Sequence, residues 1–91
     1  MRYTLVYPES YLRRARKFLK KHPEITGQYS KTLQLLELDP THPSLRLHTL
    51  RGRLQGLHSV SVNIAYRIVI HFLVEGDRIL LVDVGKHDDV Y

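Results

Sequence analysis

The stretch from Leu57 to Val84 limits the fold more than any other part of this sequence. In residues 57–64 mostly apolar and mostly polar positions alternate, and His58, Val60, Val62 and Ile64 form one of the two sets. This period of two indicates a strand with one face in a core. Residues 66–74 (YRIVIHFLV) are richly apolar, as in a central strand, and residues 78–84 (RILLVDV) return after the turn residues Glu75, Gly76 and Asp77. Because short turns join these strands, we predict that they pair antiparallel.

The first half of the chain adds a strand and two helices. Residues 2–7 (RYTLVY) are β-branched and aromatic, which favours a strand that Pro8 ends. Residues 9–21 carry an amphipathic helical stripe made of Tyr11, Leu12, Ala15, Phe18 and Leu19. A second helical pattern contains Ile25, Tyr29, Leu33 and Leu36, and closes at Asp39-Pro40.

Two helices joined this tightly are predicted to form an antiparallel hairpin. Residues 45–48 (LRLH) are a candidate for one more short strand. The predicted fold class is therefore α+β, with an N-terminal strand and a helical hairpin packed on one face of a four- or five-stranded, mainly antiparallel sheet.

Size and composition favour one domain that spans residues 1–91. The hydrophobic fraction of 43% suffices for a packed core, and the absence of cysteine excludes disulfides and thiolate metal sites. The N-terminus lacks a secretory apolar region, and no apolar run reaches the roughly 20 residues of a membrane span. We therefore expect a cytoplasmic protein without membrane association, stabilised by packing alone.

The net charge of +5 equals that of one helix-sized segment, and a second basic zone lies in the middle of the chain. Residues 9–21 hold six basic residues and one acid, which gives a local charge of 6 − 1 = +5. Residues 40–74 contain no acid, and they include Arg46 and Arg67. The candidate phosphate-binding residues are Arg13, Arg14, Lys17, Arg51, Arg53 and Lys86. Charge alone leaves two readings open, an anionic partner such as nucleic acid or an acidic protein segment, and a solvated helix face.

The histidines divide by their sequence context. His22 and His42 each precede a proline, so we expect them on the surface. His58 is predicted at the edge of the apolar face with its polar atoms satisfied. His71 shares the strand phase of Arg67, which leaves two readings open, a side chain that faces a site and a half-buried structural one. His48 and His87 remain, beside turns or strand ends where a rigid scaffold can present a side chain.

A metal site has no support in the spacing of these residues. His87, Asp88 and Asp89 are adjacent, and neighbouring residues seldom converge on one ion. There is no glycine-rich phosphate loop and no serine-nucleophile elbow. We therefore expect neither a metal nor another cofactor, and Asp88 and Asp89 are expected to cap or orient.

One set of residue types fits RNA cleavage without a metal. The reaction needs a group that deprotonates the 2′-hydroxyl and a group that protonates the leaving 5′-oxygen, and histidine titrates near neutral pH. The pentavalent phosphorane needs arginine or lysine, and a tyrosine can stack on a base. The chain supplies these types in His48, Arg67, Lys86, His87 and Tyr91. Composition does not bring them together, since that requires the fold.

The second half of the chain resembles toxins of the RelE/ParE superfamily, most closely the YafQ-like branch. The shared motifs are His-x-Leu-x-Gly (48–52), the following glycine and leucine (56–57), Tyr-Arg-Ile-Val (66–69) and Val-Gly-x-His-Asp-x-Val-Tyr (84–91). The first half matches in the order and length of its elements. The resemblance implies a RelE-like fold and the toxin arm of a type II toxin–antitoxin system. Such toxins cleave mRNA in the ribosomal A site, and the resemblance implies that no metal or other cofactor is needed.

The resemblance also implies a role for each matching residue. His48 would be the general base, His87 the general acid, and Arg67 with Lys86 the stabilisers of the phosphate. Tyr91 would orient or stack on the base. The basic residues of 9–21 would bind ribosomal RNA through charge.

The sequence departs from the YafQ-like pattern at three positions. The branch carries a histidine near Ser61, an acid near Ala65 and an arginine at the position of Asp83. Because an acid repels the scissile phosphate, either Arg67 and Lys86 stabilise it here or the activity is reduced or lost.

Two alternatives to an mRNA interferase therefore stay open. One is a toxin of the same fold without ribonuclease activity, acting on DNA gyrase. The other is a non-toxic relative that binds an antitoxin. The partners implied by the resemblance are a cognate antitoxin protein, mRNA and the ribosome, with operator DNA reached only through the antitoxin complex.

Overall fold

The computed structural model describes residues 2–86, and Met1 and residues 87–91 lie outside the described part. The α-helices are α1 (Glu9–Lys21) and α2 (Thr26–Leu38). The strands are β1 (Thr4–Val6), β2 (His48–Thr49), β3 (His58–Ser61), β4 (Tyr66–Phe72) and β5 (Arg78–Lys86). Short 3₁₀ turns are η1 (Pro23–Ile25), η2 (Pro43–Leu45) and η3 (Gly52–Leu54).

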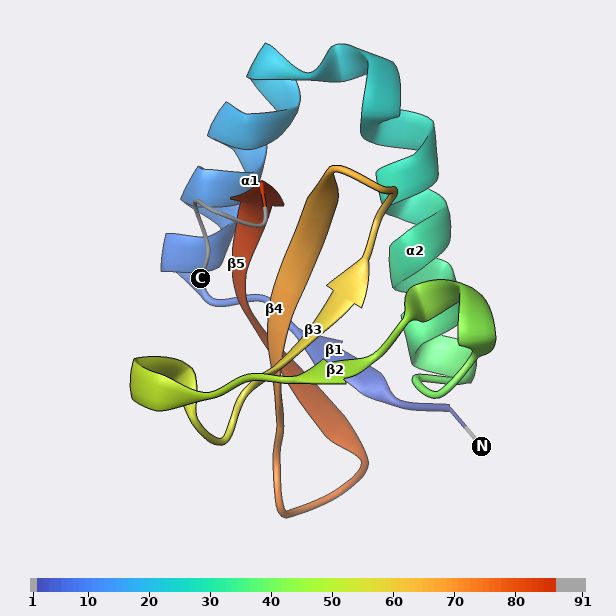
Figure 1. Ribbon diagram of the computed structural model, residues 1–91, viewed down its shortest axis with the longest axis vertical. Coiled ribbons are helices and arrows are strands. Elements are labelled where there is room, and N and C mark those ends of the chain that lie inside the picture. The colour runs from blue at the N-terminus through green and yellow to red at the C-terminus, as the bar shows by residue number, and fades with distance from the viewer. Residues whose placement is uncertain (1, 87–91) are drawn as a thin grey trace.

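Within residues 2–86 the strands form one five-stranded sheet in the order β1-β5-β4-β3-β2 (Figure 1). β1 runs parallel to β5, and the other neighbours pair antiparallel. β4 lies at the centre, as its apolar sequence predicts. The predicted α+β class and the mainly antiparallel sheet are confirmed.

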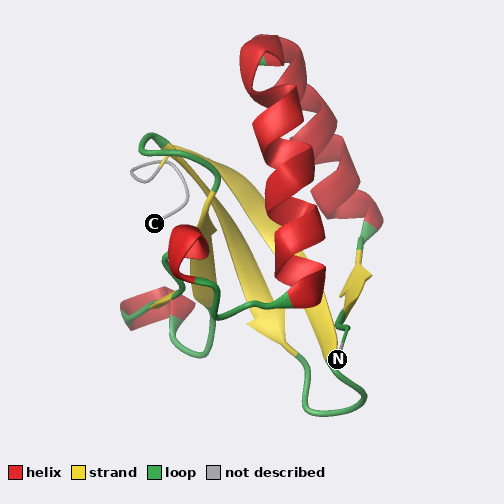
Figure 2. Ribbon diagram, turned by 90° about the vertical axis from the view of Figure 1, so that its right-hand side faces the viewer, coloured by secondary structure: helices red, strands yellow, loops and turns green. Residues whose placement is uncertain are grey.

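α1 and α2 cover one face of this sheet, and the main core lies between them and the strands (Figure 2). The stripe of α1 buries Tyr11 and Ala15, while α2 buries Tyr29 and Leu36. The strands contribute buried residues of the same parity, including Val60, Ile68, Ile70, Ile79 and Leu81. The helical and strand periodicities of the sequence therefore meet in one apolar layer.

The other face of the sheet, here called the open face, carries a smaller apolar cluster. Leu50 and Val69 are buried in it, and Leu54, Leu57 and Val82 pack against them. The segment that links β2 to β3 supplies most of this cover. Beside this cluster the open face carries polar side chains, among them Ser59, Arg67 and Asp83.

Two local predictions are wrong. The alternation suggests that Ile64 faces the core, but β3 ends at Ser61 and Ile64 is 101% exposed. Asn63 ends the strand because its Oδ1 accepts hydrogen bonds from the backbone nitrogens of Ala65 and Tyr66, each at 2.9 Å.

Residues 45–48 do not form the suggested strand either. The 3₁₀ turn η2 occupies Pro43–Leu45, and Arg46 adopts a left-handed conformation with φ 48°. Extended pairing begins only at His48. The left-handed residue turns the chain from η2 into β2, which a β-strand over 45–48 would not allow.

Neither α1 nor α2 is long and apolar enough to cross a lipid bilayer.

A pair of tyrosines joins α1 to α2 inside the core. The hydroxyls of Tyr11 and Tyr29 are hydrogen-bonded to each other. Burial raises the pKa of Tyr11 above its ordinary value of 10.0, and it raises the pKa of Tyr29 as well. Both phenols are therefore held in the neutral form.

We expect this pair to make the protein sensitive to alkali. Above pH 10 the unfolded chain loses its phenolic protons while the folded chain keeps them, so the stability present below pH 10 falls as pH rises. In a Tyr11→Phe/Tyr29→Phe variant this part of the loss should disappear. Urea denaturation at pH 7 and from pH 9 to 11 measures it, and identical pH slopes in the two proteins would contradict the expectation.

Candidate functional site

Arg67 is held in a fixed position on the open face. Its Nε donates to Ser59 Oγ at 3.0 Å, and its Nη2 donates to the backbone carbonyl of Arg46 at 3.0 Å. Ser59 is fully buried, and the left-handed Arg46 closes η2 beside it. The half-buried guanidinium is thereby held at two of its nitrogens. Among residues 2–86 its Nη1 has no hydrogen bond, so this nitrogen is suited to donate to a phosphate oxygen.

His48 lies on the same face as Arg67. His48 pairs with Ser59 across β2 and β3, and paired residues share a face of the sheet. Ser59 contacts Arg67 directly. The exposed imidazole on β2 and the guanidinium on β4 therefore lie on either side of the buried Ser59, which belongs to the intervening strand β3.

The structure does not bring Lys86 to this side. Lys86 pairs with Tyr66, and Tyr66 packs against Phe18 and His22 on the helix face. Arg67 pairs instead with Gly85. Lys86 therefore lies on the α1 side of the sheet, where it lines a cleft together with Arg14 and Lys17.

The remaining arginines of the phosphate-binding prediction lie apart from that cleft. Arg51 and Arg53 are exposed in the loop between β2 and β3, which crosses the open face. Arg13 is exposed on α1. The candidate cations thus form two groups, with His48, Arg51, Arg53 and Arg67 on or beside the open face and Arg14, Lys17 and Lys86 on the helix side.

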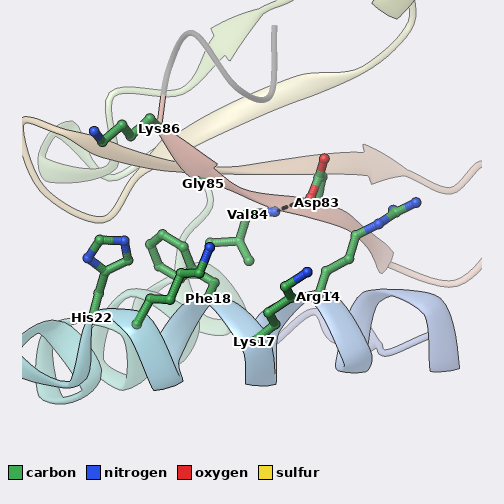
Figure 3. A pocket seen from close by; sticks show the side chains of 9 residues that line it. Arg14, Lys17, Phe18, His22, Asp83, Val84, Gly85 and Lys86 are labelled. Atoms are coloured by element: carbon green, nitrogen blue, oxygen red, sulfur yellow. Dashed lines mark hydrogen bonds between the residues drawn. The ribbon is translucent and has the colours of Figure 1, made fainter.

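Asp83 lies at an irregularity of β5. Ile70 pairs with Leu81 and Val69 with Asp83, so Val82 is an extra residue in the ladder. Asp83 shares the open face with Val69, and its Oδ1 accepts from the backbone nitrogen of Val84 at 2.8 Å. Figure 3 shows the carboxylate directed away from α1. The acid therefore stands on the face that carries Arg67.

Ser61 occupies the position where the resemblance leads one to look for a histidine. It pairs with Arg67, and its hydroxyl donates to the backbone carbonyl of Asn63 at 2.7 Å. Ala65 lies exposed in the turn that follows. These side chains supply no titrating group near neutral pH.

His22 is a residue whose surroundings the sequence prediction missed. It is half-buried rather than on the surface, with its Nδ1 3.2 Å from the hydroxyl of Tyr66 and its ring 4.9 Å from that of Phe18. A signal was present, because His22 follows Phe18 by four positions and extends the buried stripe of α1.

The other described histidines differ in their exposure. His42 is exposed, as predicted, and its Nδ1 accepts from the backbone nitrogen of Ser44. His71 is exposed instead of half-buried. His58 packs edge-on against Phe72, but its buried Nδ1 has no partner among the described residues, so the prediction of satisfied polar atoms is wrong.

The predicted residues His87 and Tyr91, with Asp88 and Asp89, lie outside the described residues. Within residues 2–86 no group of three histidine or acidic side chains is arranged to hold a metal ion.

The sequence matches no known protein family profile and no curated protein. Its structure is similar to YafQ from E. coli strain BL21(DE3), at 13% identity and a TM-score of 0.78 over 98% of each chain. It is also similar to a YoeB/ParE toxin from Agrobacterium tumefaciens, at 15% identity and a TM-score of 0.72 over 92% of this chain and 98% of that one.

A third similar structure is the toxin–antitoxin complex RelBE2 from Mycobacterium tuberculosis, at 17% identity and a TM-score of 0.62 over 96% of this chain and 100% of the matched one. The likeness covers nearly the whole chain in each case. The chain has the fold of RelE/ParE-type toxins.

Proposed function

We propose that the protein is the toxin of a type II toxin–antitoxin module and cleaves mRNA on the ribosome without a metal ion. The observation that carries this proposal is the guanidinium of Arg67, held by Ser59 and Arg46 on the face that also presents His48. The fold shared with YafQ and RelBE2 supports the toxin role.

The proposed reaction is an attack of the 2′-hydroxyl on the adjacent phosphate. His48 accepts the proton of the 2′-hydroxyl, the new bond between the 2′-oxygen and phosphorus forms, and the bond to the 5′-oxygen breaks. Arg67 stabilises the charge of the phosphorane. His87 is proposed to protonate the leaving 5′-oxygen, and Tyr91 to stack on the base. These two assignments rest on the sequence.

Mapping the 5′ ends of cellular mRNA tests this proposal. Primer extension on RNA from cells that express the protein should show new 5′ ends within translated message. A His48→Ala variant, which lacks the proposed base, should lower the cleavage by about 10²–10⁴-fold. Unchanged cleavage in this variant would overturn the assignment of His48, and intact message with the unaltered protein would overturn the ribonuclease proposal.

Asp83 should limit the rate of this reaction. Its carboxylate shares the open face with Arg67 and repels a bound phosphate. Asp83 is half-buried at the surface of the sheet, and removing its solvent-screened repulsion is worth about 0.5–1 kcal/mol. Asp83→Asn should therefore raise the cleavage rate about two- to fivefold, and the amide oxygen can still accept from Val84. The control Asp77→Asn removes one acid at the other end of β5. Equal rates for both variants would show that Asp83 does not face the phosphate.

The proposed partners are a cognate antitoxin, the ribosome with its mRNA, and operator DNA. A cognate antitoxin is proposed because the similar RelBE2 structure is a toxin–antitoxin complex. The basic residues of α1 are proposed to contact ribosomal RNA through charge. Operator DNA is proposed to be reached only through the antitoxin. A gene for a small acidic protein beside this one would support the pairing.

A toxin of the same fold without ribonuclease activity is the second candidate. Asp83 on the open face and the backbone-bonded hydroxyl of Ser61 favour it. Inhibited DNA supercoiling by gyrase together with intact message would select this function. Expression without growth arrest would instead indicate a non-toxic relative that binds an antitoxin.

A further inference from the structure

A cationic cleft lies between α1 and the end of β5, on the side of the sheet opposite Arg67 (Figure 3). Its volume of about 430 Å³ is in the range of small-ligand sites, roughly 300–1,000 Å³. The cations that line it are Arg14, Lys17 and Lys21 from α1 and Lys86 from β5. The helical spacing of three and four places the first three on one stripe.

These charges are not neutralised within the described chain. Among residues 2–86 the ion pairs are Arg16–Glu9 and His22–Glu24, and neither contains a cation of the cleft. Asp83 contributes to the rim, but its carboxylate is directed away from α1 and accepts from Val84. Like charges three and four residues apart on a helix repel each other, so a bound anion would relieve an existing repulsion.

One end of the cleft is aromatic. Phe18 and His22 line it, and Tyr66 backs them with ring centroids 5.0 and 4.9 Å away. The hydroxyl of Tyr66 contacts His22 Nδ1, which fixes the imidazole plane. Lys86 lies at the same end as His22 (Figure 3). A flat π-system thus lies beside the positive charge of Lys86.

We propose that this cleft binds one nucleotide unit of RNA, with its phosphate among Lys17, Lys21 and Lys86 and its base against His22 and Phe18. Cations along a groove with aromatic rings for stacking are the features that bind single-stranded nucleic acid. The choice of RNA rests on the proposed function. The site is distinct from the proposed cleavage site, since the sheet separates it from Arg67.

An acidic peptide is a weaker match to the same cleft. Carboxylates are best recognised by a free arginine fork, and the Nη1 of Arg14 already donates to the carbonyl of Val82 at 3.1 Å. The other cations are lysines, which act on phosphate as point charges. A peptide would also leave the aromatic end without a stacking partner.

Binding without cleavage tests this inference. The full chain is titrated with a short 2′-O-methyl oligoadenylate, which has no 2′-hydroxyl to react, and the affinity is measured at several salt concentrations. Lys17→Gln/Lys21→Gln should weaken binding about tenfold and reduce the salt slope by roughly 0.7, the contribution of one phosphate contact. The control Lys31→Gln/Arg78→Gln removes the same charge elsewhere and should do neither.

Two further ligands separate the sources of binding. Adenosine 5′-monophosphate should shift the imidazole NMR signals of His22, whereas inorganic phosphate should bind without shifting them. Equal weakening in the two double variants would overturn the proposal, as would a polyglutamate peptide that binds as tightly as the oligonucleotide. Such results leave the proposed cleavage untouched if message is still cut, and a cleft that binds RNA in a protein that cuts none would overturn only the proposed function.

Discussion

Replacing Arg67 with alanine should lower the rate of the proposed RNA cleavage by about 10²–10³-fold, the usual loss when one fixed donor to a developing anion is removed. The reason is the fixed position of the guanidinium, since Ser59 Oγ and the carbonyl of Arg46 hold it at 3.0 Å each. A donor held in place before the reaction needs no reorganisation in the transition state. Single-turnover cleavage of message on programmed ribosomes measures the effect.

Two further variants separate the charge of Arg67 from its geometry. Arg67→Lys keeps the charge but cannot donate to Ser59 and Arg46 while facing a phosphate, so it should recover only part of the activity. Arg78→Ala removes an exposed arginine at the other end of β5 and should cleave at the normal rate. Full activity in Arg67→Ala would contradict the role of Arg67 as the residue that stabilises the phosphate.

Replacing Ile70 with alanine should destabilise the fold by about 2–5 kcal/mol, the range for truncating a buried aliphatic side chain. Ile70 is 0% exposed on the central strand and pairs with Leu81, which is equally buried. Because small domains are stable by only about 5–15 kcal/mol, this loss is a large part of the total. Urea denaturation measures it as a lower midpoint at an unchanged slope.

The sequence itself offers the matched control. Ile64→Ala makes the same substitution at a side chain that is 101% exposed, so it should change stability by no more than about 0.5 kcal/mol. Similar losses in the two variants would mean that the turn after β3 packs more tightly than the structure shows.

Strand and helix periodicity was sufficient to predict the main core. The parity of Ile68 and Ile70 and the stripe of Tyr11 and Ala15 follow from local spacing, and the structure buries all four. Periodicity gives the wrong position for Ile64. The alternation continues in the sequence to residue 64, but the side-chain hydrogen bonds of Asn63 have already ended the strand. A pattern of apolar residues does not report such a competing local bond.

The candidate site was predictable in residue type but not in arrangement. His48 and Arg67 stand out in the sequence, yet their common face depends on the pairing of β2 with β3 and on Ser59 between them. The role of Ser59 was not predicted, because the sequence around a serine in a strand does not indicate which arginine its hydroxyl will bind. His22 was assigned to the surface because Pro23 suggested a turn, and tertiary packing against Tyr66 decided otherwise.

The sequence by itself determined the elements, their order and the apolar faces that must meet, because these depend on spacing along the chain. Only the tertiary structure decided on which side of the sheet each cation lies. The pairing of β4 with β5, with its extra residue at Val82, places Gly85 opposite Arg67 and Lys86 opposite Tyr66. Since paired residues share a face, Lys86 joins the cleft of α1 while Arg67 faces the other way.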